Sequence, residues 1–259
     1  MTTREKSSSH CHVRRAWASR RPGRGRVARV PARLVPALLA VLVATTGCSL
    51  LDGGGPERQE VTGTALDVLA TLEVRDRAPR TGYDRELFGE RWADVDGNGC
   101  DTRNDVLRRD LDDVDLDRRN GCLVWSGVLV DPYSGVVVDF ERGPGTSPEV
   151  QVDHVVALSD AWQKGAQEWD AGTREAFAND PLNLLAVDGD VNEAKSDGDA
   201  ATWLPPEHAV RCAYVARQVA VKAAYGAWVT EAERDAVARV LAECPDEQVP
   251  TRDDVATPV

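Results

Sequence analysis

The sequence has no apolar run long enough to cross a membrane. Its longest such run, LVPALLAVLVA, covers residues 34–44, whereas a spanning helix needs about 20 apolar residues. Residues 1–33 before it carry ten Lys/Arg and one acid, which is typical of a signal peptide. We therefore expect residues 1–47 to be a signal peptide and the protein to be extracellular or in the cell envelope.

A cysteine follows this apolar run at a position where lipid can be attached. Gly47-Cys48 resembles a bacterial lipobox, in which Cys48 would be lipidated and anchor the protein to the outer face of the membrane. Thr45 departs from the lipobox pattern, and ordinary cleavage with free secretion is the alternative. Residues 48–60 are rich in glycine and polar residues and predict a flexible tether.

Closely spaced cysteine pairs such as Cys-x-x-Cys are absent, which argues against a structural zinc site. Four well-separated cysteines follow the leader, and an even number in an exported domain predicts two disulfides. Three pairings are possible. We favour Cys100–Cys122 and Cys212–Cys244, because each pair lies within one local segment.

Positive charge is scarce after the leader. Residues 48–259 contain 21 basic and 42 acidic residues, a net charge of −21, against −12 for the whole chain. Such a charge repels polyanions unless it is reversed locally. A nucleic-acid substrate therefore requires a basic cleft, for which the candidates are Arg103, Arg108, Arg109, Arg118, Arg119, Arg142 and Lys195.

The remaining pattern predicts a single α+β domain over residues 61–245. Helical spacing is found at 61–74, 155–177, 207–229 and 230–244, and Thr230-x-x-Glu233 is a capping box. A mixed-charge helix that gives way to a loop is expected over 106–117, and a β-hairpin over 122–140. Residues 246–259 are expected to be a disordered tail. The expected core tryptophans are Trp92, Trp125, Trp162, Trp169, Trp203 and Trp228.

Histidine is also scarce, since only His154 and His208 follow the leader. His208 has no obvious partner and is expected to be structural or exposed. His154 directly follows Asp153 at the end of a strand-like alternation. A second strand-like run opens with Asn183, and a short helix follows it through Asn192 and Lys195.

These residue types suit metal-assisted hydrolysis of a phosphate ester. Asp and Asn oxygens are ligands that Mg²⁺ accepts beside water and phosphate. A neutral imidazole next to them can remove a proton from an attacking water.

The stretch VDHVVALSDAW…NDPLNLLAVDGDVNEAKSD resembles the HNH (ββα-metal) endonuclease superfamily. It is most similar to the HNH domain at the C-terminus of GmrSD-type restriction enzymes and to secreted actinobacterial proteins that carry this domain. The resemblance is strong over residues 151–205 and weaker from about Trp92 to Cys244. It implies a ββα-metal finger embedded in a mostly helical, disulfide-stapled domain with an additional β-hairpin.

The resemblance also implies a role for each matching residue. His154 would be the general base, and Asp153 and Asn192 would bind Mg²⁺ or Mn²⁺. Asn183 would hold the loop that orients His154, and Lys195 would contact phosphate. Asn192 replaces the last histidine that gives the superfamily its name, and it still supplies an oxygen ligand.

A second motif, DVDGNGCDTRND, resembles a calcium-binding EF-hand loop. Asp94, Asp96, Asn98, Thr102 and Asp105 occupy ligand positions, and Cys100 would supply a backbone carbonyl. The alternative is an ordinary turn in which this segment caps a helix.

Two functions follow from these expectations. The first is an exported or lipid-anchored metal-dependent endonuclease that cuts DNA, with RNA as a further substrate. Its partner would be nucleic acid without sequence preference, and no obligate protein partner is inferred. The alternative is a non-catalytic, calcium-binding envelope lipoprotein that keeps the HNH scaffold.

Overall fold

The computed structural model describes residues 60–256, which lie within one compact unit. The expected signal peptide, the lipidation at Cys48 and nearly all of the expected tether fall outside the described residues. The fold is mixed α and β, with two small antiparallel sheets and two disulfides. None of the helices within residues 60–256 is long and apolar enough to span a bilayer.

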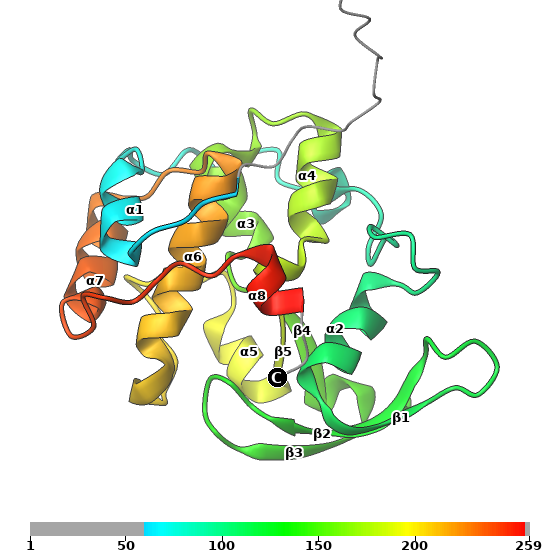
Figure 1. The fold of residues 1–259 in the computed structure, drawn as a ribbon. Helices are drawn as coiled ribbons and strands as arrows, with labels where there is room; N and C mark the ends of the chain where they lie inside the picture. Colours follow the sequence, from blue (N-terminus) through cyan, green and yellow to red (C-terminus); the bar gives the residue numbers. More distant parts are fainter. Residues whose placement is uncertain (1–59, 257–259) are drawn as a thin grey trace, which may run out of the picture. The chain divides into compact units, whose positions relative to one another are not determined.

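A three-stranded antiparallel sheet with the order β1–β2–β3 lies at one end of the unit (Figure 1). Its strands are β1 (Asp112–Leu116), β2 (Val124–Val130) and β3 (Val137–Glu141). The hairpin expected over 122–140 is therefore confirmed. Residues 112–116 were expected to continue a helix or form a loop. They instead pair with β2, on the side opposite β3. Strand pairing overrides the weak β propensity of this aspartate-rich stretch.

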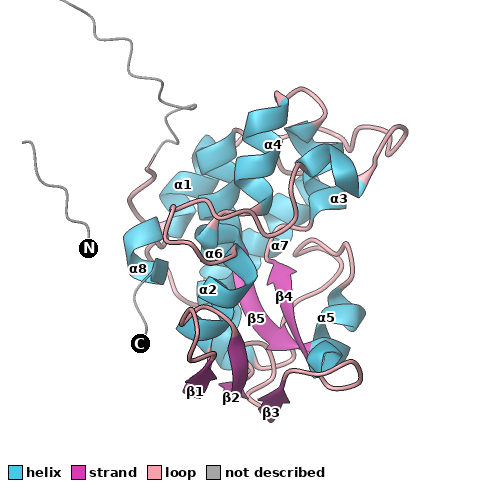
Figure 2. Cartoon of the chain, turned by 90° about the vertical axis from the view of Figure 1, so that its right-hand side faces the viewer, coloured by secondary structure: helices cyan, strands magenta, loops and turns pink. Residues whose placement is uncertain are grey.

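The second sheet brings together the two segments that carry the Asp-His and Asn motifs. Strand β4 (Val150–His154) pairs antiparallel with β5 (Leu184–Asp188), so that His154 lies opposite Leu184. Helix α5 (Gly189–Lys195) follows β5 directly and packs against β4. A strand, a strand and a helix thus follow in the predicted order (Figure 2).

Most helices lie at the end of the unit away from the three-stranded sheet, with β4 and β5 between (Figures 1 and 2). The first helix, α1, and the last two long helices, α6 and α7, lie where the sequence predicts helices. The segment 155–177 is less regular than expected, because Gly165 has φ +131° and breaks it into three pieces. The helices are α1 (Ala65–Thr71), α2 (Thr102–Asp110), α3 (Leu158–Ala161), α4 (Ala171–Ala178), α6 (Arg211–Tyr225), α7 (Glu231–Leu241) and α8 (Arg252–Ala256), and the short 3₁₀ or π turns are η1 (Arg85–Phe88), η2 (Ser147–Glu149), η3 (Trp162–Ala166), η4 (Pro181–Asn183) and η5 (His208–Val210).

Both predicted disulfides are present. Cys100–Cys122 joins the segment before α2 to the segment before β2, and Cys212–Cys244 joins α6 to the segment after α7. Each bond closes a loop within one half of the fold, and such a loop stabilises the protein mainly by restricting its unfolded chain.

The expected disordered tail is wrong for residues 246–256. Val249 is buried, and Arg252 binds the buried carboxylate of Asp180 at 2.6 Å. The tail also meets the start of the unit, because the Ala65 amide donates to the Glu247 carbonyl and Thr64 pairs with Gln248. The residues that the tail contacts are distant from it in the sequence, so the local composition of the tail did not predict its order.

Charged residues from six segments form a buried ion cluster beneath α3, α6 and α7. Lys164 is fully buried and lies 2.8 Å from Asp160, 2.8 Å from Asp199 and 2.6 Å from Glu233. The cluster contains three bases and three acids, so its charges balance: Arg77, Lys164, Lys222, Asp160, Asp199 and Glu233. The predicted N-cap Thr230 does accept from the Glu233 amide, but the Glu233 side chain serves this cluster.

The start of α5 requires a glycine. A Cβ atom on Gly189 would lie 2.2 Å from the backbone carbonyl oxygen of Pro148, a distance that forces η2 and α5 apart. We expect Gly189→Ala to lower the free energy of unfolding by about 1–3 kcal/mol, measured by urea denaturation. Gly145→Ala is the matched control, because nothing lies within 4 Å of its Cβ position. An equal effect of both substitutions would contradict this close packing.

Candidate active site

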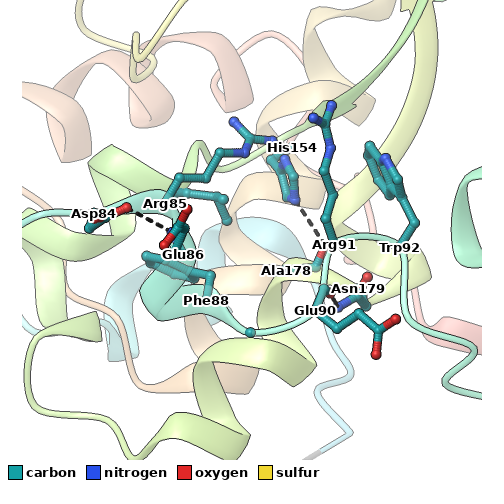
Figure 3. A pocket seen from close by; sticks show the side chains of 12 residues that line it. Asp84, Arg85, Glu86, Phe88, Glu90, Arg91, Trp92, His154, Ala178 and Asn179 are labelled. Carbon is teal, nitrogen blue, oxygen red and sulfur yellow. Dashed lines mark hydrogen bonds between the residues drawn. The ribbon is translucent and has the colours of Figure 1, made fainter.

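His154 lies where two adjoining pockets meet. The larger, of about 720 Å³, is also lined by Asp153 and Asn192. The smaller, of about 390 Å³, is lined by η1, the loop after it and the end of α4 (Figure 3). We refer to the two together as the cleft. The structure thus brings three of the predicted site residues, from β4 and α5, to one cavity.

The surroundings of His154 fix which ring nitrogen is free to act as a base. Its Nε2 lies 2.9 Å from the carbonyl oxygen of Ala178. Because a carbonyl only accepts, Nε2 carries the proton, and Nδ1 keeps its lone pair. Burial lowers the pKa of His154 to about 3, with the Ala178 carbonyl opposing this and nearby cations adding to it. The imidazole is therefore neutral at pH 7 and can accept a proton through Nδ1.

Asp153 is buried and held by two side chains. Its Oδ1 accepts from Lys195 Nζ at 3.0 Å, and its Oδ2 accepts from the Tyr133 hydroxyl at 2.7 Å. Burial raises the pKa of Asp153, while Lys195 and Tyr133 act against that rise. Tyr133, in the turn between β2 and β3, gave no functional signal in the sequence.

Lys195 does not lie where the sequence analysis expected it. The residue is only 2 % exposed, and its Nζ donates to Asp153 and to the backbone carbonyl of His154. As the last residue of α5, it points into the contact between α5 and β4 and not toward the open cleft. Lys195 thus contacts both residues of the Asp153-His154 pair and does not line the cleft. Its contact with phosphate stays a prediction.

Asn183 forms a bracket around the backbone that follows His154. Its Oδ1 accepts from the Val156 amide at 2.8 Å, its Nδ2 donates to the Val156 carbonyl, and its backbone carbonyl accepts from the Val155 amide. The side chain is fully buried. Strand β4 ends at His154, and these hydrogen bonds hold the chain at the point where it leaves the strand. The role of Asn183 in orienting His154 stays a prediction.

Asn192 lies on α5 and lines the cleft together with Asp153. Its Nδ2 donates to Gln151 Oε1 at 2.8 Å, so the amide orientation is fixed and its Oδ1 is the atom available as a ligand. Within residues 60–256, no three His, Cys, Asp or Glu side chains converge as metal ligands. A Mg²⁺ ion commonly takes only one or two protein ligands beside water and phosphate, and the pair Asp153 and Asn192 has that chemistry.

The arginines at the cleft are mostly not the predicted ones. Of the seven basic residues expected there, only Arg103 lines it. Arg85 and Arg91, which the sequence analysis did not consider, line both pockets beside His154 (Figure 3). The others lie elsewhere: Arg109 binds backbone carbonyls of η4 and β5, Arg142 binds Asn104, Lys195 is buried, and Arg108, Arg118 and Arg119 are exposed on α2 and in the loop between β1 and β2.

Two strained residues also lie at this cleft. Within residues 60–256, three non-glycine residues have positive φ angles, and Trp92 (φ +64°) and Ser196 (φ +50°) line the larger pocket. Such backbone strain gathers at functional sites. Trp92 is half-buried with its ring nearly parallel to the His154 imidazole, at 6.1 Å between centroids. Trp92 therefore lines the cleft and also packs against the core cluster around α2 and the two sheets. The core placement expected for Trp125 is wrong, because its side chain is 44 % exposed.

The predicted calcium loop forms a hydrogen-bonded turn before α2. Asp94 accepts from the amides of Gly97 and Gly99, and the Nδ2 atom of Asn98 lies 2.9 Å from Asp96 and 3.1 Å from Asp105. Cys100 is in its disulfide, and Thr102 donates to a backbone carbonyl. An amide group thus lies between the carboxylates. Calcium binding stays a prediction.

The comparisons with known proteins agree with the resemblance noted in the motif. The family model for the C-terminal domain of GmrSD restriction endonucleases matches residues 101–240, more than half of the chain. An uncharacterized secreted protein of Arthroderma benhamiae is 38 % identical over 183 residues, which cover 70 % of this chain and 85 % of that protein. No solved structure matches the chain. The chain belongs to the family of GmrSD restriction endonuclease C-terminal domains.

Proposed function

We propose that this protein is an exported, metal-dependent HNH endonuclease that hydrolyses phosphodiester bonds of nucleic acid. One observation carries the proposal: Asp153, His154 and Asn192 line one cleft, from a strand and a helix in the order of a ββα-metal finger. Membership in a restriction endonuclease family supports a nuclease-related function. Export is supported by the leader sequence and by the secreted relative, with the lipid anchor at Cys48 as part of the proposal.

The residues present fit a small, hard cation. A carboxylate and an amide oxygen are the donors that Mg²⁺ and Mn²⁺ accept. An ionised carboxylate has about four acceptor sites. Asp153 accepts from Lys195, Tyr133 and the His154 backbone, which leaves it room for a further partner. When bound, a divalent ion there would stabilise the negative charge that develops on the phosphate and the leaving oxygen.

The chain's own residues would move the proton. Nδ1 of His154 takes a proton from a water molecule, and the water oxygen forms a bond to phosphorus. The bond from phosphorus to the leaving oxygen breaks, and that oxygen then takes up a proton. Asn183 and the Ala178 carbonyl hold the imidazole and its tautomer in place during this step. Lys195 holds Asp153 beside His154.

Divalent metal should control activity completely. We expect the purified protein to nick supercoiled plasmid with Mg²⁺ or Mn²⁺, to lose activity in EDTA, and to regain it when the metal is restored. Asp153→Asn should lower the activity at saturating metal and raise the metal concentration needed for half-maximal rate, because it removes the charged ligand. Asp190→Asn, an exposed change on α5 outside the cleft, is the control and should leave both quantities unchanged.

Two results would contradict the proposal in different ways. Equal cleavage in EDTA and in Mg²⁺ would exclude the metal-dependent mechanism. Cleavage of small phosphodiesters without cleavage of plasmid, single-stranded DNA or RNA would indicate a hydrolase that acts on another phosphoester.

A further inference from the structure

The wall of the cleft opposite β4 comes from outside the family-matched region. The family model begins at residue 101, whereas Arg85, Arg91 and Trp92 precede it and lie beside His154 (Figure 3). We refer to residues 84–92 as the arginine-tryptophan wall. The family match therefore does not cover this part of the cleft.

We propose that the arginine-tryptophan wall selects single-stranded nucleic acid. Trp92 would stack on an unpaired base, and Arg85 and Arg91 would bind the phosphates next to the one that is cut. The inference rests on the proposed function, because it takes His154 as the reacting centre.

The arginines of this site lack acidic partners. No ion pair within residues 60–256 engages Arg85, Arg91 or Arg103. All three line the larger pocket. Burial lowers the pKa of Arg91 and of Arg103; Arg85 adds to this effect at Arg91, and Arg142 and Arg91 add to it at Arg103, where Asp101 opposes it. Acidic residues also line the cleft, Glu193 and Asp197 in the larger pocket and Asp84, Glu86 and Glu90 in the smaller one, but none of them forms an ion pair with these arginines. The guanidinium groups can therefore bind phosphate, which a guanidinium does in a bidentate way.

Trp92 is held in an unfavourable backbone conformation by a buried residue. The Oδ1 atom of Asn179 accepts from the Ala93 amide at 3.1 Å, and its Nδ2 donates to the Glu90 carbonyl at 3.0 Å. These two bonds flank Arg91 and Trp92 and fix the segment against α4. A positive φ angle in a bulky residue costs energy and persists only where its surroundings enforce it. The result is an indole ring that lies beside His154 at the cleft, packs against the core on its buried side and has the Arg91 guanidinium 5.4 Å from its centroid.

This arrangement favours an unpaired base over a base pair. In a duplex both faces of a base are covered by its neighbours, so stacking on a side chain requires an unpaired or extruded base. His154 is only 7 % exposed, so the phosphate that it serves must enter between the wall and β4. A single strand can place a phosphate there and leave its next base on Trp92.

Binding of short oligonucleotides in EDTA tests this proposal without cleavage. The probes are a labelled single strand, the same strand with every base removed, and the corresponding duplex, each made in DNA and RNA. We expect Trp92→Ala to weaken binding of the base-bearing single strand roughly tenfold and to leave binding of the abasic strand unchanged. Trp92→Phe should keep most of the affinity. Trp125→Ala, which removes an exposed tryptophan outside the cleft, should have no effect.

The arginines should give a different pattern. Arg85→Gln combined with Arg91→Gln should weaken binding of the base-bearing and abasic strands alike and reduce the salt dependence of binding. The proposal is overturned if Trp92→Ala weakens both strands equally, if it has no effect, or if the duplex binds as tightly as the single strand. Because binding is measured in EDTA, it does not depend on catalysis. Trp92-dependent binding, combined with no cleavage when Mg²⁺ or Mn²⁺ is added, would count against the nuclease and not against this specificity.

Discussion

His154→Ala is expected to lower the rate of plasmid nicking by about 10²–10⁴-fold and to leave the fold intact. The substitution removes the group that accepts the proton from water, and no other imidazole within residues 60–256 lines the cleft. The remaining activity would come from the metal ion and from the positioning of the substrate.

His208→Ala is the matched control for this experiment. His208 is exposed on η5 and does not line the cleft, so nicking should continue at the wild-type rate. Far-UV circular dichroism and the melting temperature of both variants show whether the fold is kept. Equal activity of His154→Ala and the wild type would exclude His154 as the general base.

Lys164→Met is expected to have the largest effect on stability, a loss of about 3–5 kcal/mol in the free energy of unfolding. The methionine keeps most of the volume but removes the charge that lies within 3 Å of three carboxylates. Two bases then remain to balance three buried acids, and a buried carboxylate without a partner is costly. Urea or thermal denaturation measures the loss.

The exposed pair of Arg234 with Asp235 provides the comparison for Lys164. Arg234→Ala removes an ion pair of similar distance, 2.8 Å, in which both side chains are in solvent, and we expect no measurable change in stability. If both variants lost the same stability, the buried ion cluster would have no special role in holding the helices together.

The same cluster predicts how stability changes with pH. Its cations hold the pKa values of Asp160 and Asp199 below their usual range, and its acids raise the pKa of Lys222. The carboxylates contribute stability above the unfolded-state pKa of about 3.9 and lose it as the pH falls through their folded values. Lys222 contributes below about 10.4 and loses its contribution as the pH rises further. The Lys164→Met effect should therefore be smaller near pH 2 than at pH 7.

The site could be predicted from sequence where its residues are close together or fixed in order. Asp153-His154, Asn183 and Asn192 follow a strand, strand and helix pattern that local periodicity reveals. In the structure Asp153, His154 and Asn192 line one cleft, and Asn183 is buried next to it. The two disulfide pairings could be predicted for the same reason, because each bond closes a local segment.

The parts that were missed depend on contacts between distant segments. Arg85 and Arg91 have no recognisable motif, and only the packing of η1 against α3 and α4 brings them to His154. The buried ion cluster joins residues from Arg77 to Glu233, and each of these residues alone looks like a surface charge. Strand β1 is stabilised by pairing with β2, and the tail by the contact of Arg252 with Asp180. Neither contact can be predicted from the local propensity of these segments.

The meeting of the two ends of the described unit has a consequence for engineering. Thr64 and Ala65 contact Gln248 and Glu247 directly, so residues near 60 and 256 belong to one side of the fold. A short linker could join these ends, and new ends could be opened in the exposed turn around Arg119 between β1 and β2. Such a circular permutant would keep β4, β5 and α5 uninterrupted and would leave Tyr133 bound to Asp153.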